Sequence, residues 1–314
     1  MKNTHYYYLL KLLRPRQWIK NLALFAGITF SGQLFDIDAL ISVGIAFISF
    51  CFLSSSTYII NDILDIQKDR LHPFKRMRPL ASGKVSHVEA IILFVVLLTA
   101  ALVLASDLSG IFLLIAIVYM LLQISYSVVI KSVVIFDIFF IATGYILRVL
   151  AGGEIVDYHI SVWLLLTTVS LSLFLAVGKR RSELTLLRNR TESKIAEIRK
   201  SLSHYSENLL DAYTAIFATT AIFFYTMFTF LEHPRGMRIS LEFLLPEFLP
   251  YYLQRKWLMI TIIPVIYGIM RYMQDIYEKS EGESPDRILL ADKALLASVL
   301  TWVVMVIAII YFIA

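Results

Sequence analysis

The sequence predicts an all-α polytopic membrane protein with about nine transmembrane helices around a central cavity. Hydrophobic residues make up 58% of its 314 residues, 17% are charged, and the mean hydropathy is +0.72. Soluble domains are roughly 45–50% apolar and about 25% charged. The apolar stretches are continuous rather than alternating, which excludes a porin-like barrel as well as a soluble enzyme. We expect residues 1–314 to form a single integral-membrane domain.

Each expected span is a window of apolar residues, because a helix needs about 20 of them to cross a bilayer. In chain order the windows are 21–35, 39–61, 88–106, 109–128, 133–151, 160–178, 208–230, 258–277 and 289–312. The aromatic and charged stretch within 231–257 predicts an interfacial helix. The charged loop after the sixth span predicts an amphipathic helical hairpin.

The distribution of Lys and Arg predicts the orientation. Basic residues precede the first span and fill the loops after the second and sixth spans, whereas the connections 1–2, 3–4 and 5–6 contain none. By the positive-inside bias, the N-terminus and the two large basic loops face the cytoplasm. We attribute the net charge of +5 to this topology, so no nucleic-acid partner is expected.

An acidic motif lies at the inner end of the second span. At 100° per residue, Asn61, Asp62, Asp65 and Asp69 fall within an arc of about 100° on a helical wheel. Clustered carboxylates repel one another unless a cation neutralises them, and hard oxygen ligands suit Mg²⁺. The alternative is a solvated helix end whose acids pair with nearby cations, namely Lys68, Arg70 and Arg76.

Cations follow the acids directly. Lys75, Arg76 and Arg78 stand between two helix-stopping prolines, Pro73 and Pro79. Cations beside a metal site suit a shared polyanion such as a phosphate. The alternative is an ordinary positive-inside loop.

Two further segments carry polar residues near the inner surface. Gln17, Lys20 and Asn21 share a helix face at the start of the first span, where lipid contact would require apolar residues. This face could offer donors to a phosphate or a sugar. Lys179 and Arg180 belong to a basic triplet at the end of the sixth span, which is either an orientation signal or part of the site.

The fifth span contains two ionisable residues, which inside a membrane are functional candidates. Asp137 lies close enough to the inner turn to reach the site. Arg148 lies about 24 Å from that turn at 1.5 Å per residue. We therefore expect Arg148 to pair with Glu154 or Asp157 near the outer surface.

These motifs resemble the UbiA prenyltransferase superfamily. The superfamily pattern is Asn61-Asp62-x-x-Asp65-x-x-x-Asp69. Narrower motifs resemble its decaprenyl-phosphate phosphoribosyltransferase branch, namely Arg14-Pro15-Arg16-Gln17-Trp18-x-Lys20-Asn21, His72-Pro73-x-Lys75-Arg76-x-Arg78-Pro79, Tyr126-Ser127 with Lys131, and Gly178-Lys179-Arg180-Arg181. The loop after the sixth span lacks the second Asp-rich motif that aromatic prenyltransferases of this fold carry.

The resemblance implies Mg²⁺-dependent transfer of 5-phosphoribosyl from phosphoribosyl pyrophosphate to a polyprenyl phosphate, with release of pyrophosphate. It assigns the catalytic and metal-binding roles to Asn61, Asp65 and Asp69. It assigns substrate phosphates to the polar residues Gln17, Lys20, Lys75, Arg76, Arg78, Lys131, Lys179 and Arg180.

Two other functions remain open at this point. The same fold could move a prenyl group from a prenyl diphosphate to an aromatic or glycerol-phosphate acceptor, although the missing second Asp-rich motif argues against it. A transporter of a phosphorylated solute would be expected to show interrupted half-helices in inverted repeats, and the sequence shows none. The oligomeric state is left open.

Overall fold

The computed structural model describes residues 2–71, 75–191, 200–232, 256–278 and 285–313, and within these ranges every regular element is helical. The interfacial helix expected within 231–257 and the hairpin expected after the sixth span fall largely on residues 233–255 and 192–199, outside the described ranges.

Eight helical segments of the described chain are long and apolar enough to cross a membrane. Their helices are α3 (Ile37–Leu64), α5 (His87–Leu108), α6 (Gly110–Val128), α7 (Phe136–Ile155), α8 (Val162–Thr191), α10 (Glu207–Leu231), α12 (Ile262–Glu278), extended at its start by η7 (Trp257–Thr261), and α14 (Lys293–Ala308). The prediction of an all-helical membrane protein is confirmed.

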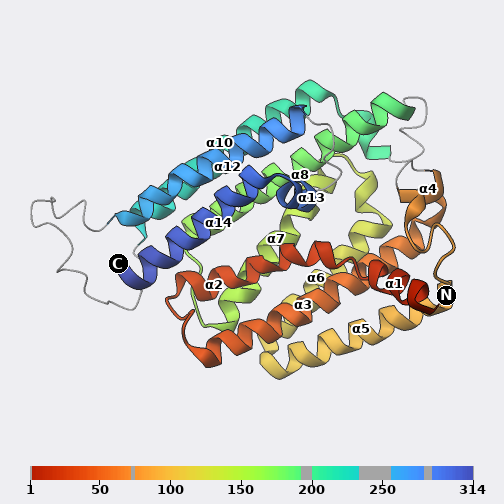
Figure 1. The fold of residues 1–314 in the computed structure, drawn as a ribbon, viewed down its shortest axis with the longest axis horizontal. Coiled ribbons are helices and arrows are strands. Elements are labelled where there is room, and N and C mark those ends of the chain that lie inside the picture. Colours follow the sequence, from red (N-terminus) through yellow and green to blue (C-terminus); the bar gives the residue numbers. More distant parts are fainter. Residues whose placement is uncertain (1, 72–74, 192–199, 233–255, 279–284, 314) are drawn as a thin grey trace, which may run out of the picture.

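The first expected span takes an unusual form. Here the chain forms a 3₁₀ helix of ten residues, η1 (Pro15–Leu24), and then a six-residue α-helix, α2 (Phe25–Phe30). A 3₁₀ helix rises about 2.0 Å per residue and an α-helix about 1.5 Å, so the two together extend about 29 Å. That length matches the roughly 30 Å hydrocarbon core. Figure 1 shows this segment running beside α3, as a ninth crossing would.

The helices lie side by side, with α3 packed along α5 and α8 packed along both α7 and α10 (Figure 1). The short helix α4 (Ile66–Leu71) lies at the same end of the molecule as α1 (Lys2–Leu12), and the C-terminus lies at the other end. Several helices begin at a side chain that accepts hydrogen bonds from the first turn, as N-caps do. These caps are Asp36, Ser86, Ser109, Ser206 and Asp292.

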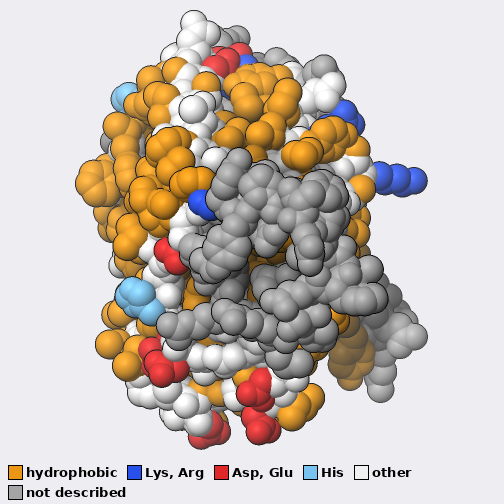
Figure 2. Space-filling model, turned by 90° about the vertical axis from the view of Figure 1, so that its left-hand side faces the viewer, with side chains coloured by type: hydrophobic (Ala, Val, Ile, Leu, Met, Phe, Trp, Pro, Cys, Tyr) orange, Lys and Arg blue, Asp and Glu red, His pale blue; other side chains and the backbone are white. Residues whose placement is uncertain are grey.

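Helix α5 shows how the bundle divides between lipid and protein. Its exposed face carries large apolar residues such as Val88, Ile92 and Val95, whereas small residues, Ala101 and Ala105, lie buried. Small residues let helix backbones approach closely in a membrane. Figure 2 views the end of the molecule that carries the C-terminus, where the described side chains are largely hydrophobic and few are basic.

The first crossing packs directly against the backbone of α7. A Cβ atom built on Gly152 would lie 1.9 Å from the carbonyl oxygen of Leu24, and one on Gly27 would lie 2.6 Å from the carbonyl oxygen of Gly152. Only glycine fits at these two positions without a shift of the backbone. The two glycines therefore fix how closely the first crossing lies to α7.

The expected partners of Arg148 were wrong. Its guanidinium instead donates to Asn21 Oδ1 (2.6 Å), the carbonyl oxygen of Gly144 (2.6 Å) and the hydroxyl of Tyr119 (2.8 Å). Side chains on a helix lean toward its N-terminus, so Arg148 reaches back into the bundle rather than outward. Arg148 thus ties η1 and α6 to α7.

Candidate active site

The acidic motif keeps its helical spacing across a break in the backbone. Helix α3 ends at Leu64, Asp65 has φ −100° and ψ 6°, and α4 begins at the next residue. The amide of Asp65 still donates to the carbonyl of Asn61 (3.0 Å), and that of Asp69 to the carbonyl of Asp65 (2.8 Å). Asn61, Asp65 and Asp69 therefore stand on successive turns and share one face, as their spacing predicts.

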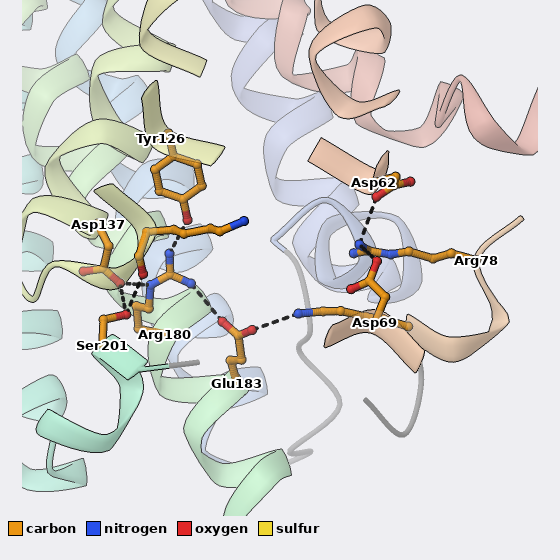
Figure 3. Close-up of polar contacts among 10 residues, drawn as sticks. Asp62, Asp69, Arg78, Tyr126, Asp137, Arg180, Glu183 and Ser201 are labelled. Carbon is orange, nitrogen blue, oxygen red and sulfur yellow. Dashed lines mark hydrogen bonds and ion pairs between the residues drawn. The ribbon is translucent and has the colours of Figure 1, made fainter. Parts of the chain in front are cut away.

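One arginine holds two of the acids together. Nη1 of Arg78 lies 3.0 Å from Oδ1 of Asp62 and 2.6 Å from Oδ2 of Asp69 (Figure 3). Asp62, which is almost fully buried, also pairs with Arg14 at the start of η1. This connects the loop after α4, the acidic motif and the first crossing in one chain of ion pairs.

The third acid pairs with a residue from a distant turn. Nζ of Lys131, in the turn between α6 and α7, lies 2.5 Å from Oδ1 of Asp65. The backbone carbonyl of Lys131 accepts a hydrogen bond from Ser201 (2.9 Å), which fixes the turn. Within the described chain the acids therefore do not pair with the neighbouring cations Lys68, Arg70 and Arg76.

Burial and charge act in opposite directions on this cluster. Burial raises the pKa of Asp69 above its usual range, although the nearby guanidinium of Arg78 works against the shift. Burial alone would lower the pKa of Arg78, but the carboxylates of Asp62 and Asp69 outweigh it and raise that pKa. Arg78 therefore stays charged, whereas Asp69 accepts a proton more readily than an exposed aspartate.

A second cluster surrounds Arg180 on α8, which is fully buried. Its guanidinium lies 2.7 Å from Oδ2 of Asp137, 2.8 Å from Oε2 of Glu183 and 2.7 Å from the hydroxyl of Tyr126 (Figure 3). Two carboxylates and a hydroxyl hold the planar guanidinium in one orientation.

Asp137 is itself held by the segment that precedes α10. It accepts a hydrogen bond from the hydroxyl of Tyr205 (2.8 Å), and it is fully buried. The hydroxyl of Ser201 lies 3.2 Å away and shares its one proton between Asp137 and the carbonyl of Lys131. Burial raises the pKa of Tyr205 well above its usual range, so this phenol remains a hydrogen-bond donor. Asp137 thus contacts the cationic part of the candidate site through Arg180.

Glu183 joins the two clusters. Its Oε1 lies 3.1 Å from Nζ of Lys75, and its other oxygen binds Arg180 (Figure 3). No sequence motif described above gives Glu183 a role. Its position three residues after Arg180, on the same helix face, is the signal that could have identified it.

The remaining predicted residues divide into two groups. Lys20 donates to Oε1 of Gln17 (2.5 Å) on η1, and Lys179 lies half-buried beside Arg180. Arg76 is exposed, and in the described part of the chain it makes no ion pair or side-chain hydrogen bond. The side chain of Asn61 likewise hydrogen-bonds to no other described residue. The structure therefore pairs Arg78 and Lys131 with the acids and links Lys75 and Arg180 through Glu183, but it leaves Arg76 facing outward.

The acids fit a metal that brings phosphate ligands with it. Within the described residues, no three His, Cys, Asp or Glu side chains converge as a metal cage would require. Mg²⁺ needs only one or two carboxylates when substrate phosphates and water complete its shell. The carboxylates of Asp65 and Asp69 and the side-chain amide oxygen of Asn61 offer such oxygen ligands, and the three residues lie on adjacent turns of one face.

Solved structures share this fold. A UbiA homologue from Archaeoglobus fulgidus bound to GPP and Mg²⁺ is 19% identical and superposes with a TM-score of 0.69, over 96% of this chain and 99% of its own. A UbiA homologue from Aeropyrum pernix is 16% identical, with a TM-score of 0.59 over 91% of this chain and 97% of its own.

Curated relatives match almost the whole sequence. The decaprenyl-phosphate phosphoribosyltransferase of Mycolicibacterium smegmatis is 35% identical over 97% of this chain and 92% of its own length. The enzyme of that name from Corynebacterium glutamicum is 33% identical over 96% and 86%. The model of the UbiA prenyltransferase family matches residues 22–289. The chain therefore belongs to the UbiA prenyltransferase family.

Proposed function

We propose that this protein transfers the 5-phosphoribosyl group of phosphoribosyl pyrophosphate to a polyprenyl phosphate of the decaprenyl type, with Mg²⁺ and with release of pyrophosphate. The observation that carries the proposal is the charge of the candidate site. Arg78 and Lys131 pair with its acids, and Glu183 links Lys75 to Arg180 beside them. No second Asp-rich motif follows α8 in the sequence. Such a site suits a donor with an extra phosphate and an acceptor that is itself a phosphate. The names of the relatives support the same reaction.

Asn61, Asp65 and Asp69 would hold the metal together with the pyrophosphate of the donor. Bound Mg²⁺ would supply charge neutralisation on the departing pyrophosphate. Arg78, Lys131 and the remaining cations, with Gln17, would bind the donor phosphates and the lipid phosphate. Glu183 and Asp137 would keep Lys75 and Arg180 in place.

The reaction forms one bond and breaks one. An oxygen of the acceptor phosphate attacks C1 of the ribose, and the C1–oxygen bond to pyrophosphate breaks, so that the electron pair leaves with pyrophosphate. The acceptor phosphate is already ionised at neutral pH, so the site needs no strong general base. Negative charge grows on the leaving group, and fixed cations stabilise it more in the transition state than in the ground state.

We further propose that the protein lies in the cytoplasmic membrane of a prokaryote with the acidic motif on the cytoplasmic side. The sequence is basic directly after the motif and again from Lys179 to Lys200, and the positive-inside bias places such stretches in the cytoplasm. This orientation presents the site to a water-soluble donor and keeps the prenyl chain of the acceptor between the helices.

Prenyl transfer is the second candidate, favoured by the fold neighbours bound to GPP or DMAPP with Mg²⁺. One experiment separates the two functions. Purified protein in lipid nanodiscs receives decaprenyl phosphate, Mg²⁺ and phosphoribosyl pyrophosphate labelled in the ribose, and the lipid phase is counted. We expect label in the lipid only when acceptor and Mg²⁺ are both present. An unlabelled lipid phase, together with prenylated product from geranyl diphosphate and an aromatic acceptor, would establish the alternative.

A further inference from the structure

In this structure, two acids assigned to the metal are each paired with a cation assigned to a phosphate. Lys131 lies 2.5 Å from Asp65, and the two side chains are 16% and 15% exposed. Arg78 lies 2.6 Å from Asp69, whose side chain is 6% exposed. The carboxylates assigned to the metal and the cations assigned to the diphosphate thus neutralise each other's charge.

A metal ion alone has to break these pairs. It would take Asp65 and Asp69 as ligands and leave Lys131 and Arg78 beside a dication in a poorly solvated place, where like charges repel strongly. A diphosphate alone faces the converse problem, since drawing the two cations away leaves the carboxylates unpaired beside an anion. When metal and diphosphate arrive together, each charge of the site exchanges one partner for another.

We propose that the site takes magnesium diphosphate as a unit through this exchange of ion pairs, and that Lys131 and Arg78 act as counter-ions that exclude the free metal. The proposal rests on the metal and phosphate roles given above. Both cations are held while they change partner. Arg78 keeps Asp62, and the backbone of Lys131 stays bonded to Ser201.

Binding measurements test the proposal without turnover. Mn²⁺ replaces Mg²⁺ as an EPR-visible probe, and the protein is purified and inserted in nanodiscs. Free Mn²⁺ is titrated in one series, and Mn²⁺ with excess methylenediphosphonate in the other. We expect the diphosphonate to tighten Mn²⁺ binding by about tenfold or more, within the usual range of coupling between sites.

The decisive variant is Lys131→Met. Exchange of ion pairs predicts two opposite effects: free Mn²⁺ binds about fivefold or more tightly, and the Mn²⁺–diphosphonate complex binds about fivefold or more weakly. Lys131→Arg should restore the wild-type pattern and shows that the turn still folds. Lys68→Met is the matched control, because Lys68 is exposed on α4, carries the same charge and makes no ion pair or side-chain hydrogen bond with other described residues. It should change both affinities by less than about twofold.

Free Mn²⁺ binding that is unchanged or weaker in Lys131→Met, or that rises equally in Lys68→Met, would overturn the proposal. The test is independent of which group is transferred, because the diphosphonate mimics the leaving group common to phosphoribosyl and prenyl donors. Failure of the labelled-lipid assay would refute the proposed function and leave the binding result standing.

Discussion

Asp137 offers a quantitative test of the cluster around Arg180. Both side chains are fully buried and their charged atoms are 2.7 Å apart. Removing one partner of a buried ion pair costs about 3–5 kcal/mol, because the other charge is left in a poorly solvated place. Here Glu183 stays on Arg180, so we expect Asp137→Asn to lower the free energy of unfolding by about 3 kcal/mol, at the lower end of that range.

Asp137→Ala should cost more than Asp137→Asn. The alanine leaves the hydroxyl of Tyr205 without its acceptor, which adds about 1–3 kcal/mol, whereas asparagine still offers an oxygen. Ser201 keeps the carbonyl of Lys131 as its acceptor in both variants. The assay is equilibrium unfolding of the purified protein by SDS in mixed micelles, followed by circular dichroism.

The matched control is Asp211→Asn. Asp211 pairs with Arg181 at 2.7 Å, but its side chain is 36% exposed. Pairs with such access to water contribute about 0–1 kcal/mol. If Asp137→Asn lowers the free energy of unfolding no more than Asp211→Asn does, the buried ion pair between Asp137 and Arg180 does not stabilise the fold as proposed.

Three further predictions concern other parts of the chain. Asp65→Asn should reduce transfer to the lipid by at least about 100-fold, because it removes a group that stabilises charge in the transition state. The yield and elution volume of the purified variant should stay normal. Activity within about threefold of wild type would remove Asp65 from the metal site. Gly152→Ala places a Cβ atom 1.9 Å from the carbonyl oxygen of Leu24, so it should lower the SDS unfolding midpoint more than alanine at Gly44, where a Cβ meets nothing within 4 Å. Lys84→Cys should react with a membrane-impermeant maleimide in inverted vesicles, whereas Asp38→Cys should react in intact spheroplasts. The two positions are exposed and lie at opposite ends of the bundle, and the one native cysteine is buried. Labelling of both from the same side would refute the topology.

The membrane made most of the fold predictable. A bilayer requires each crossing to be a continuous apolar run whose backbone groups bond within the helix, so hydropathy marks the spans. The window 88–106 became His87–Leu108, and 109–128 became Gly110–Val128. The bounds of the first crossing were harder to predict. A 3₁₀ helix covers the same length with fewer residues than an α-helix, and this one begins at Pro15, whereas the expected window begins at residue 21.

In the candidate site, local geometry was predictable and long-range partners were not. The shared face of the acidic motif follows from the helical repeat alone. The partners come from elements far apart in the chain: Asp65 and Lys131 are 66 residues apart, and Arg148 and Asn21 are 127 apart. No spacing rule relates such positions. The partners predicted for Arg148 were carboxylates nearby in the sequence. Its side chain leans toward the N-terminus of α7 instead and donates to uncharged groups.

The contact between Lys75 and Glu183 has a consequence for how the protein is made. These residues are 108 positions apart, so the ribosome completes the acidic motif well before α8 emerges. Until α8 enters the bilayer, Lys75 lacks Glu183, and Arg180 is absent altogether. A nascent chain interrupted before that point holds the aspartates but lacks Arg180 and Glu183. Under the proposed function, its capacity to bind a phosphorylated donor therefore arises late in biogenesis, when the two parts of the polypeptide meet.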